Sequence, residues 1–547
     1  MVAVMCGLFL VALDQTIIAT ALTAILNEFQ SYSSLGFIVT AYLLTTTITV
    51  PIAGKLSDMY GRRPMLITGV LVFTIGSLLS GLSPSVEWLI GWRALQGIGG
   101  GIITSQAFTI VGDLFSPRER GRWQGFVGAV FGMSSVIGPL LGGWLTDKHH
   151  IFGLTTDWRW TFFINVPIGI IAAVIIIFNL PNIKHAEKHK PDYAGAAFIS
   201  LALASVVLAV DNTKAIFQFL IDKGVELSFI QGILWAIAII STGLFIAVER
   251  RASQPILPLR FFKKQVYAIL TVVTLLFGAA FMGSILYLTQ FNQQVYGASA
   301  EQAGYMLLPM VGGMMLSSIS TGQIVSKLGR YKAFILTGFT LATLSIFALI
   351  TLQPDTAYWH EAIIMAAAGL GLGMAMPILS LAVQNEFTQK DLGAATSSVQ
   401  LFRGLGSTVG TALFSGMLTA GIIASVGQPS NIPYIQTLKQ SPASSKLLSD
   451  DMDANTLLQI NTQRDTIAKS ADKAFAQIPV PAARNAAKKS FHTQQDKYSD
   501  DITKAFTQSL HKIFMLGGGL MAVCVVIAAF IRERPLRDNV NSTPGEE

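Results

Sequence analysis

"GKLSDMYGRRP", residues 54–64, closes an apolar run and returns in altered form as "GQIVSKLGRYK", residues 322–332. In both copies two glycines stand seven positions apart, and an arginine follows the second glycine. Further along, "VGDLFSPRERG" at 111–121 matches "VQNEFTQKDLG" at 383–393, and two later glycine pairs keep the same offset of 272. The repeats predict two homologous halves of six helices, which would place a transport site at the midplane between them. A duplicated scaffold with no transport role is the alternative interpretation.

The composition is that of a membrane protein. Of the 547 residues, 52% are hydrophobic and only 13% are charged, and the mean hydropathy is +0.54, which is unlike an ordinary soluble domain. The first apolar stretch is too long for a signal peptide and should be retained. We therefore expect an all-α membrane fold with fourteen spans, at residues 2–24, 33–54, 65–82, 86–111, 122–145, 160–180, 193–211, 229–249, 266–291, 301–325, 333–351, 359–382, 393–424 and 511–531.

The positive charges predict the topology. The loops after the even-numbered spans, together with the C-terminal tail, hold 21 lysines and arginines, whereas the short loops of the other set hold 4. The positive-inside rule therefore puts both termini in the cytoplasm. The net charge of +7 then reflects topology and gives no reason to expect a nucleic acid partner. A basic flank before the first span is missing, as expected of a chain whose natural N-terminal tail has been lost.

The expected spans divide the chain into parts. A six-helix bundle at 1–180 is followed by a linker with two additional spans at 181–265, a second six-helix bundle at 266–531 and a cytoplasmic tail at 532–547. The second bundle contains a polar insertion at 425–508, in which two prolines separate segments with helical periodicity. We expect an external helical hairpin there. It is either a lid over the exit or a decoration with no effect on transport.

Several function classes are disfavoured by what the sequence lacks. Both cysteines lie in apolar runs, and all seven histidines fall in loops or at span ends, so we expect neither a metal site nor a catalytic constellation. A nucleotide-binding loop of the G-x-x-x-x-G-K-[ST] type is missing too, which favours an ion gradient over ATP as the energy source. The cytoplasmic segments are too short for a signalling domain. We therefore expect no cofactor and no enzymatic activity.

Five motifs stand in order at the expected spans. They are "LDQTIIATAL" (13–22), "GKLSDMYGRRP" (54–64), "RALQGIGGGI" (93–102), "GAVFGMSSVIGPLLGGWLTD" (128–147) and "WRWTFFINVPIG" (158–169). Together they resemble the major facilitator superfamily, in its fourteen-span drug:proton antiporter branch, the QacA/EmrB-like group, over nearly the whole chain. The resemblance implies a monomeric antiporter of the bacterial cytoplasmic membrane that exports amphipathic, mostly cationic drugs in exchange for protons by alternating access. Transport of one metabolite or lipid by the same fold is the alternative.

Two charged residues lie deep in expected spans. Asp14 is near the middle of the first span, where a carboxylate is costly and by default functional. It could accept a proton or attract a cationic substrate, and both roles require it to face the central cavity, where proton and substrate would compete for it. For Arg93, in the fourth span, the resemblance implies a role in proton transfer. The alternatives are a structural hydrogen bond for Asp14 and an arginine bonded to carbonyls for Arg93.

The stretch at 128–147 combines small residues with a proline. Small residues let a neighbouring helix approach closely, and proline removes one backbone hydrogen bond and bends the helix. The resemblance implies an antiporter motif that seals the two halves together when the site faces outward, and static packing is the alternative. The motif residues are Gly128, Gly132, Gly138, Pro139, Gly142 and Gly143.

A cytoplasmic gate is expected at the rim of the helices. Asp58 stands four residues before Arg62, which suits a latch that also pairs with a helix terminus. The second copy has Ser326 in place of Asp58, so the latch is asymmetric. A basic loop that only sets topology is the alternative. The expected gate residues are Asp58, Arg62, Arg63, Arg118, Glu386 and Asp391.

The cavity of a broad-specificity pump should be apolar and adaptable. Each candidate for its lining could equally well face lipid or the protein core. Glu361 and His360 open the twelfth span on the outer side, where we expect solvated anchoring. The cavity candidates are Tyr42, Gln96, Phe281, Tyr287, Gln290, Asn292, Tyr305 and Met306.

Overall fold

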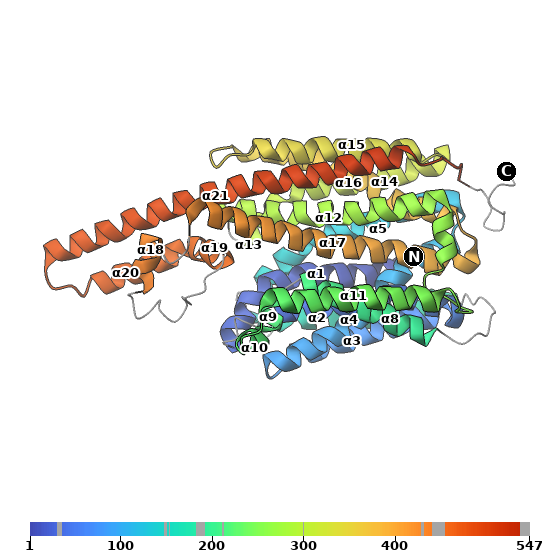
Figure 1. Ribbon diagram of the computed structural model, residues 1–547, viewed down its shortest axis with the longest axis horizontal. Coiled ribbons are helices and arrows are strands. Elements are labelled where there is room, and N and C mark those ends of the chain that lie inside the picture. The colour runs from blue at the N-terminus through green and yellow to red at the C-terminus, as the bar shows by residue number, and fades with distance from the viewer. Residues whose placement is uncertain are drawn as a thin grey trace.

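The computed structural model describes residues 1–29, 35–146, 150–151, 154–181, 192–210, 213–298, 300–427, 431–439 and 454–536. Within these ranges twelve helices are long and apolar enough to cross a membrane, and the chain is a multi-pass membrane protein. The helices lie side by side along one axis (Figure 1). The strands of the described ranges are β1 (His150–Ile151) and β2 (Leu154–Thr155), which pair antiparallel. The all-helical fold class is confirmed.

Two expected spans are not among the twelve. Helices do stand there, as α1 (Val2–Phe29) and α14 (Leu308–Leu328). In α1 the described apolar segment is Val2–Ile18, which is short for a span. In α14 the stretch 317–323 consists mostly of small polar residues, which lower its hydropathy. The count of fourteen spans therefore stays a prediction.

The first half is built around α4. It consists of α1, α2 (Leu35–Tyr60), α3 (Arg62–Gly81), α4 (Val86–Leu114), α5 (Pro117–Thr146), α6 (Trp160–Phe163) and α7 (Asn165–Asn179). α4 packs against α2 and α3, whereas α1 packs against α5 and α7. Apolar side chains of these helices form one buried cluster. Gly61 joins α2 to α3 with φ 99°, a conformation that glycine adopts without steric cost.

The second half repeats this arrangement. It consists of α12 (Gln265–Gln294), α13 (Ala300–Met306), α14, α15 (Lys332–Ala348), η3 (Leu349–Thr351), α16 (Tyr358–Asn385), α17 (Gln389–Val426) and the inner part of α21 (Pro481–Ala529). α14 and α15 pack on α16, and α12 packs on α17 and α21, around a second buried cluster. Gly329 ends α14 with φ 70°. The second glycine of each repeated motif thus has a positive φ, which favours glycine and explains its presence in both copies.

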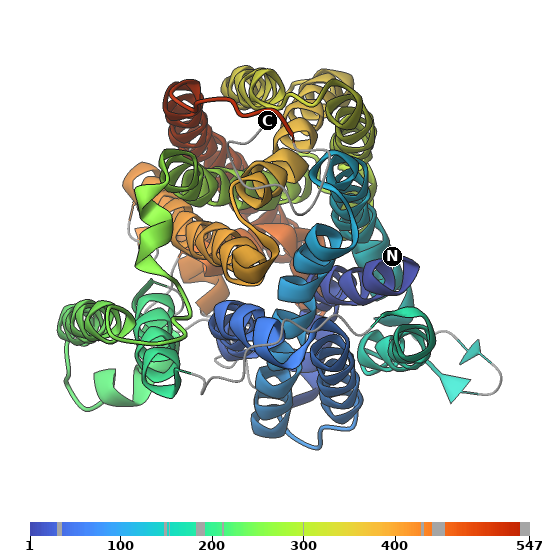
Figure 2. The ribbon, with the colours of Figure 1, turned by 90° about the vertical axis from the view of Figure 1, so that its right-hand side faces the viewer.

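The linker helices lie beside the two halves. They are α8 (Tyr193–Val210), α9 (Thr213–Ile216), α10 (Gln218–Ile221), α11 (Leu227–Glu249) and η2 (Leu259–Lys263). α8 and α11 pack together and flank the first half, as the view along the helices shows (Figure 2). α8 also touches α2 and α17, one helix of each half. The predicted domain boundaries are not tested by this packing.

The insertion projects from one end of the bundle, and the N-terminus and the end of α21 at Ala529 lie toward the opposite end (Figure 1). It contains α18 (Pro433–Lys439), α19 (Ala454–Thr462), α20 (Arg464–Phe475) and the outer part of α21. α20 packs on α21, where Asp472 pairs with His492 at 3.0 Å and Lys488 at 3.1 Å. These hydrogen bonds hold the pKa of Asp472 below its usual value. α21 continues from the insertion into the bundle as one helix, as the periodicity of 482–510 predicts.

Candidate functional site

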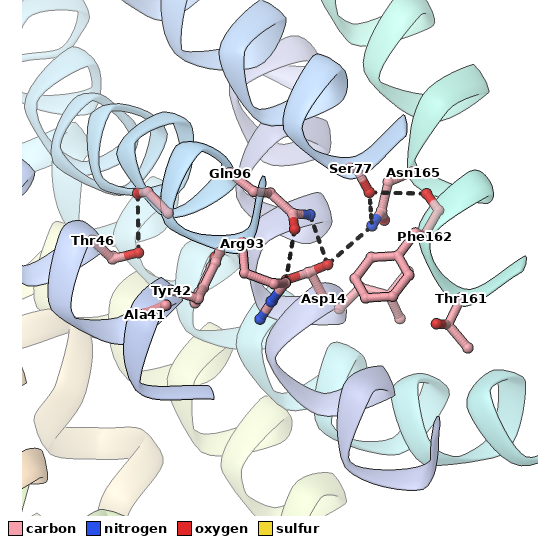
Figure 3. A network of polar contacts seen from close by, with 12 residues as sticks. Asp14, Ala41, Tyr42, Thr46, Ser77, Arg93, Gln96, Thr161, Phe162 and Asn165 are labelled. Atoms are coloured by element: carbon pink, nitrogen blue, oxygen red, sulfur yellow. Dashed lines mark hydrogen bonds and ion pairs between the residues drawn. The ribbon is translucent and has the colours of Figure 1, made fainter. Parts of the chain in front are cut away.

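Asp14 lies at the centre of a polar network inside the first half (Figure 3). Arg93 Nη1 donates to Asp14 Oδ2 at 2.5 Å, and Gln96 Nε2 donates to Oδ1 at 2.8 Å. Asn165 Nδ2 donates to the same Oδ1 at 3.2 Å and to Ser77 Oγ at 3.0 Å. Side chains of α4 and α7 therefore converge on the carboxylate of α1, and Ser77 of α3 accepts a hydrogen bond from Asn165.

The pair at the centre of this network is sealed from solvent. The Asp14 side chain is 0% exposed and that of Arg93 is 1% exposed. Buried charges lose their hydration, so such a pair needs close contact and further hydrogen bonds, which Gln96 and Asn165 supply here. We expected Asp14 to face the central cavity. In this conformation it faces other helices of the first half, with no exposed surface.

Glycines of the stretch 93–102 allow this close approach of helices. A Cβ atom on Gly97 would lie 2.4 Å from the Tyr42 carbonyl oxygen on α2. On the other side of α4, a Cβ on Gly76 of α3 would lie 2.7 Å from the Gln96 backbone nitrogen. With α2 so near, the Tyr42 ring lies 4.2 Å below the Arg93 guanidinium, which adds a cation–π contact.

A second buried charge cluster lies where α2 turns into α3. Arg62 is 0% exposed and contacts Asp58 and Asp113, with a nitrogen–oxygen distance of 2.5 Å in each pair. The cluster abuts the first turns of α17, because a Cβ on Gly393 would lie 2.2 Å from Asp58 Oδ1. A carboxylate beside a helix N-terminus is stabilised by the helix dipole. The expected latch is thus placed against the second half, with Asp113 as an additional member.

Arg118 connects the halves at the same end. Its Nε donates to the Ser326 carbonyl and its Nη2 to the Lys327 carbonyl, both at 3.0 Å. These carbonyls belong to the last turn of α14, where backbone acceptors lack intrahelical partners and the helix dipole is negative. A cation of the first half thereby caps a helix of the second half.

Replacing Arg118 with alanine should loosen this end of the molecule. Each charge-assisted hydrogen bond that is lost contributes about 1.5–3 kcal/mol. We expect a cysteine introduced at Ser326 to react with a maleimide about tenfold faster, the change that 1.4 kcal/mol produces. Arg63→Ala is the control, since Arg63 donates to the Ile177 carbonyl within the first half. Equal labelling of the two variants would show that Arg118 is not part of the gate.

The other expected gate residues form different contacts. Arg63 donates to the end of α7 and stays within the first half. Glu386 accepts from Arg534, in the segment after α21, at 3.1 Å. Asp391 pairs with Arg260 of η2 at 2.7 Å. These pairs tie the second half to the linker and the C-terminal segment, whereas we expected a gate between the halves.

Part of the glycine-rich face of α5 packs across the halves. A Cβ on Gly128 would lie 2.3 Å from Ser318 Oγ of α14, and one on Gly132 would lie 3.1 Å from Met314 and Met315. A Cβ on Gly125, one turn earlier, would lie 2.5 Å from the Ser318 carbonyl oxygen. These positions therefore bring two helices from different halves close together.

The remainder of the motif contacts other elements. A Cβ on Gly138 would lie 1.9 Å from Thr16 Oγ1 of α1, so this glycine serves packing within the first half. Pro139 lies close to α13 of the second half, since a Cβ on Gly304 would lie 3.2 Å from the Pro139 side chain. Gly142 is buried and Gly143 is partly exposed. The motif is therefore not one continuous seal between the halves.

The predicted cavity residues do not gather at one place in this conformation. Tyr42 and Gln96 belong to the Asp14 network, whereas in the second half Phe281 stacks on Phe277 and Tyr287 meets Phe414 edge to face. Tyr305 is 46% exposed. The remaining candidates, Gln290, Asn292 and Met306, also lie in the second half, on α12 and α13.

The sequence interpretation missed three polar residues. Asn165 and Asp113 lie in the quoted stretches 158–169 and 111–121, where a single polar residue beside an apolar run was the available signal. Glu361 was expected to be solvated, but it is 0% exposed. Its carboxylate faces the Asn292 amide, whose nitrogen lies 2.8 and 3.0 Å from the carboxylate oxygens once the amide is turned to donate to them. This expectation was wrong because a residue near the end of a span can still be covered by neighbouring helices.

The structure has the features of a membrane transporter. Its spanning helices form two packed halves, charge pairs are buried within the helices, and glycines bring the halves into close contact. The sequence supports this assignment directly. The chain belongs to the major facilitator superfamily, because the profile of this family matches residues 4–411. It is thus a transporter and not an enzyme, and the resemblance noted in the sequence is confirmed.

Curated relatives include proteins named as drug transporters. The chain is 35% identical over 529 residues to the multidrug transporter protein MdtP of Bacillus subtilis (strain 168), covering 96% of this chain and 91% of that protein. It is 34% identical over 415 residues to multidrug resistance protein 3 of the same organism, covering 76% and 78%. The efflux pump dotC of Dothistroma septosporum (strain NZE10 / CBS 128990) is 31% identical over 480 residues, covering 86% and 79%.

Solved structures share the fold. The crystal structure of the human organic anion transporter MFSD10 (TETRAN) matches with a TM-score of 0.58, covering 95% of this chain and 98% of that one. The identity is 14%, so this similarity concerns the fold alone.

Proposed function

We propose that this protein is a proton-coupled multidrug efflux antiporter that exports amphipathic, mostly cationic compounds by alternating access. The observation that carries the proposal is the buried Asp14–Arg93 pair, at 2.5 Å and with almost no exposed surface. Buried ionisable residues of membrane helices mark ion and substrate pathways by default. The similarity to proteins named as multidrug transporters supports the substrate class.

The coupling would arise from competition for one carboxylate. A proton on Asp14 cancels its charge, so the attraction to Arg93 is lost and the network that joins α1, α4 and α7 can rearrange. A cationic substrate that approaches the ionised carboxylate competes with the proton in the same way. Because each ligand lowers the affinity for the other, the two exchange rather than travel together.

The rearrangement must reach the contacts between the halves. We propose that the end opposite the insertion faces the cytoplasm, as its basic residues indicate. The hydrogen bonds from Arg118 of α5 to α14, and the Asp58–Arg62–Asp113 cluster against α17, would then hold the cytoplasmic side closed in this conformation. Opening them would give inward access.

The proposal is tested with purified protein in vesicles that carry an imposed pH gradient. We expect the gradient to drive transport of several unrelated amphipathic cations, with proton movement when each is added. Transport driven by a sodium gradient alone would overturn proton coupling. Transport of one metabolite or lipid, with no response to the drug panel, would overturn the multidrug assignment.

A further inference from the structure

Glu361 is a buried acid that the proposed coupling does not use. It lies in the first turn of α16, near the end of the bundle from which the insertion projects, and it is 0% exposed. The amide of Asn292 of α12, also 0% exposed, faces the two carboxylate oxygens; with the amide turned so that its nitrogen points toward Glu361, this nitrogen lies 2.8 and 3.0 Å from them. Placing a carboxylate where water cannot reach it is unfavourable unless a counter-charge or sufficient hydrogen bonds are present.

The second partner of Glu361 is a phenol. Tyr296 Oη donates its proton to the Thr356 carbonyl at 2.8 Å and is also within hydrogen-bonding reach of Glu361. A phenol carries a single proton, which is already used in the bond to Thr356. While Tyr296 donates to Thr356, its contact with Glu361 is satisfied only by a proton that Glu361 carries and donates.

No cation compensates this acid among the described residues. Its described partners are the neutral side chains of Asn292 and Tyr296. Of the other titratable groups around it, Asp355 is exposed and the rest use their polar atoms elsewhere. These are Tyr358, which donates to the Met306 carbonyl, His360, which contacts Thr351, and His511, which contacts the Leu352 carbonyl.

The repeat relates this site to the Asp14 network. α16 is the counterpart of α4, and at the offset of 272 the position equivalent to Arg93 is Met365, one helical turn from Glu361. α12 likewise corresponds to α1 as the first helix of its half. In the first half, α1 and α4 hold Asp14 and Arg93. Their counterparts in the second half, α12 and α16, hold Asn292 and Glu361, so this site has an acidic residue without a basic partner.

We propose that Glu361 is a second proton-binding site, located in the second half and reached from the side of the insertion. A proton from the aqueous phase forms an O–H bond on one carboxylate oxygen and hydrogen-bonds to Tyr296, while the other oxygen accepts from Asn292. The site deepens the proposed function and rests on it for a role in transport. Proton binding itself does not depend on transport.

Infrared difference spectroscopy of the purified full-length protein tests proton binding directly. We expect the carbonyl stretch of a protonated carboxylic acid at neutral pH, shifted by hydrogen–deuterium exchange and lost in Glu361→Gln. Glutamine retains an oxygen and a similar shape, so the fold should persist. Asp355→Asn is the matched control, because it removes an exposed carboxylate six positions away and should leave the band unchanged. A band unaffected by Glu361→Gln at every pH from about 5 to 9 would overturn the proposal.

A second measurement separates this inference from the proposed function. In vesicles with an imposed pH gradient, we expect Glu361→Gln to lower the number of protons exchanged per substrate while exchange continues. An unchanged ratio would show that the site takes no part in coupling. Should the wild type show no proton-driven transport at all, the proposed function fails, whereas the infrared band still decides whether Glu361 binds a proton.

Discussion

Replacing Asp14 with asparagine should abolish proton-driven efflux. Asparagine matches the size of aspartate but carries no charge and binds no proton, so the competition between proton and substrate disappears. The change also leaves Arg93 buried without its counter-charge, and loss of one partner of a buried pair costs about 3–5 kcal/mol. This cost lowers the stability of the fold, whereas loss of the proton-binding group removes the exchange itself, so we expect proton-driven efflux to fall to the level of vesicles without the protein.

The measurement is drug uptake by inverted membrane vesicles with an imposed pH gradient. Glu87→Gln is the control, since Glu87 is an exposed acid at the start of α4 and should not affect uptake. Thermal unfolding of the purified variant shows whether loss of activity reflects loss of fold. The double variant Asp14→Asn/Arg93→Gln should recover stability without activity. Normal coupling in folded Asp14→Asn would remove this residue from the mechanism.

Replacing Gly125 with leucine should stop the transport cycle by a different route. The new side chain would meet the Ser318 carbonyl oxygen, since even a Cβ would lie 2.5 Å from this atom, and backbone cannot move aside as a side chain can. Overpacking of this kind costs typically about 1–3 kcal/mol. If the strain acts only on the conformation with α5 against α14, the conformational equilibrium shifts about 5- to 150-fold toward separated helices.

A cysteine pair that bridges α5 and α14 measures this shift through its rate of cross-linking, which should fall together with transport. Gly312→Leu is the matched control, because Gly312 lies on α14, the helix that faces Gly125, and no atom lies within 4 Å of a Cβ built there. Equal cross-linking and equal turnover in the two variants would show that this contact is static packing.

The charged residues show what the sequence could reveal. Asp14 and Arg93 stand out because they interrupt apolar runs, so their importance was predictable, and their 2.5 Å contact was not. A contact between two residues 79 positions apart in the sequence depends on how each of their helices is rotated about its axis. Apolar residues on all sides of a helix leave that rotation undefined. Glu361 illustrates the opposite error, since burial at a helix end is decided by neighbouring elements that local sequence does not specify.

The contacts of the glycines could likewise be predicted only in part. The repeated turn glycines, Gly61 and Gly329, could be matched by spacing alone, and both adopt positive φ. The glycines of α5 could be recognised as a packing surface, yet their partners differ. Gly128 meets α14, whereas Gly138 meets α1, because successive turns of one helix face different neighbours. Spacing therefore predicted close approach without specifying which helix approaches.

The central claim is that Asp14 cannot bind a proton and a cationic substrate at the same time. Its most direct test is the number of protons released when an amphipathic cation is added to the purified protein in weakly buffered detergent, without any gradient. We predict that proton release saturates together with substrate binding and that the Asp14→Asn protein releases fewer protons than the wild type. Substrate binding of normal affinity with no proton release from the wild type would contradict the account.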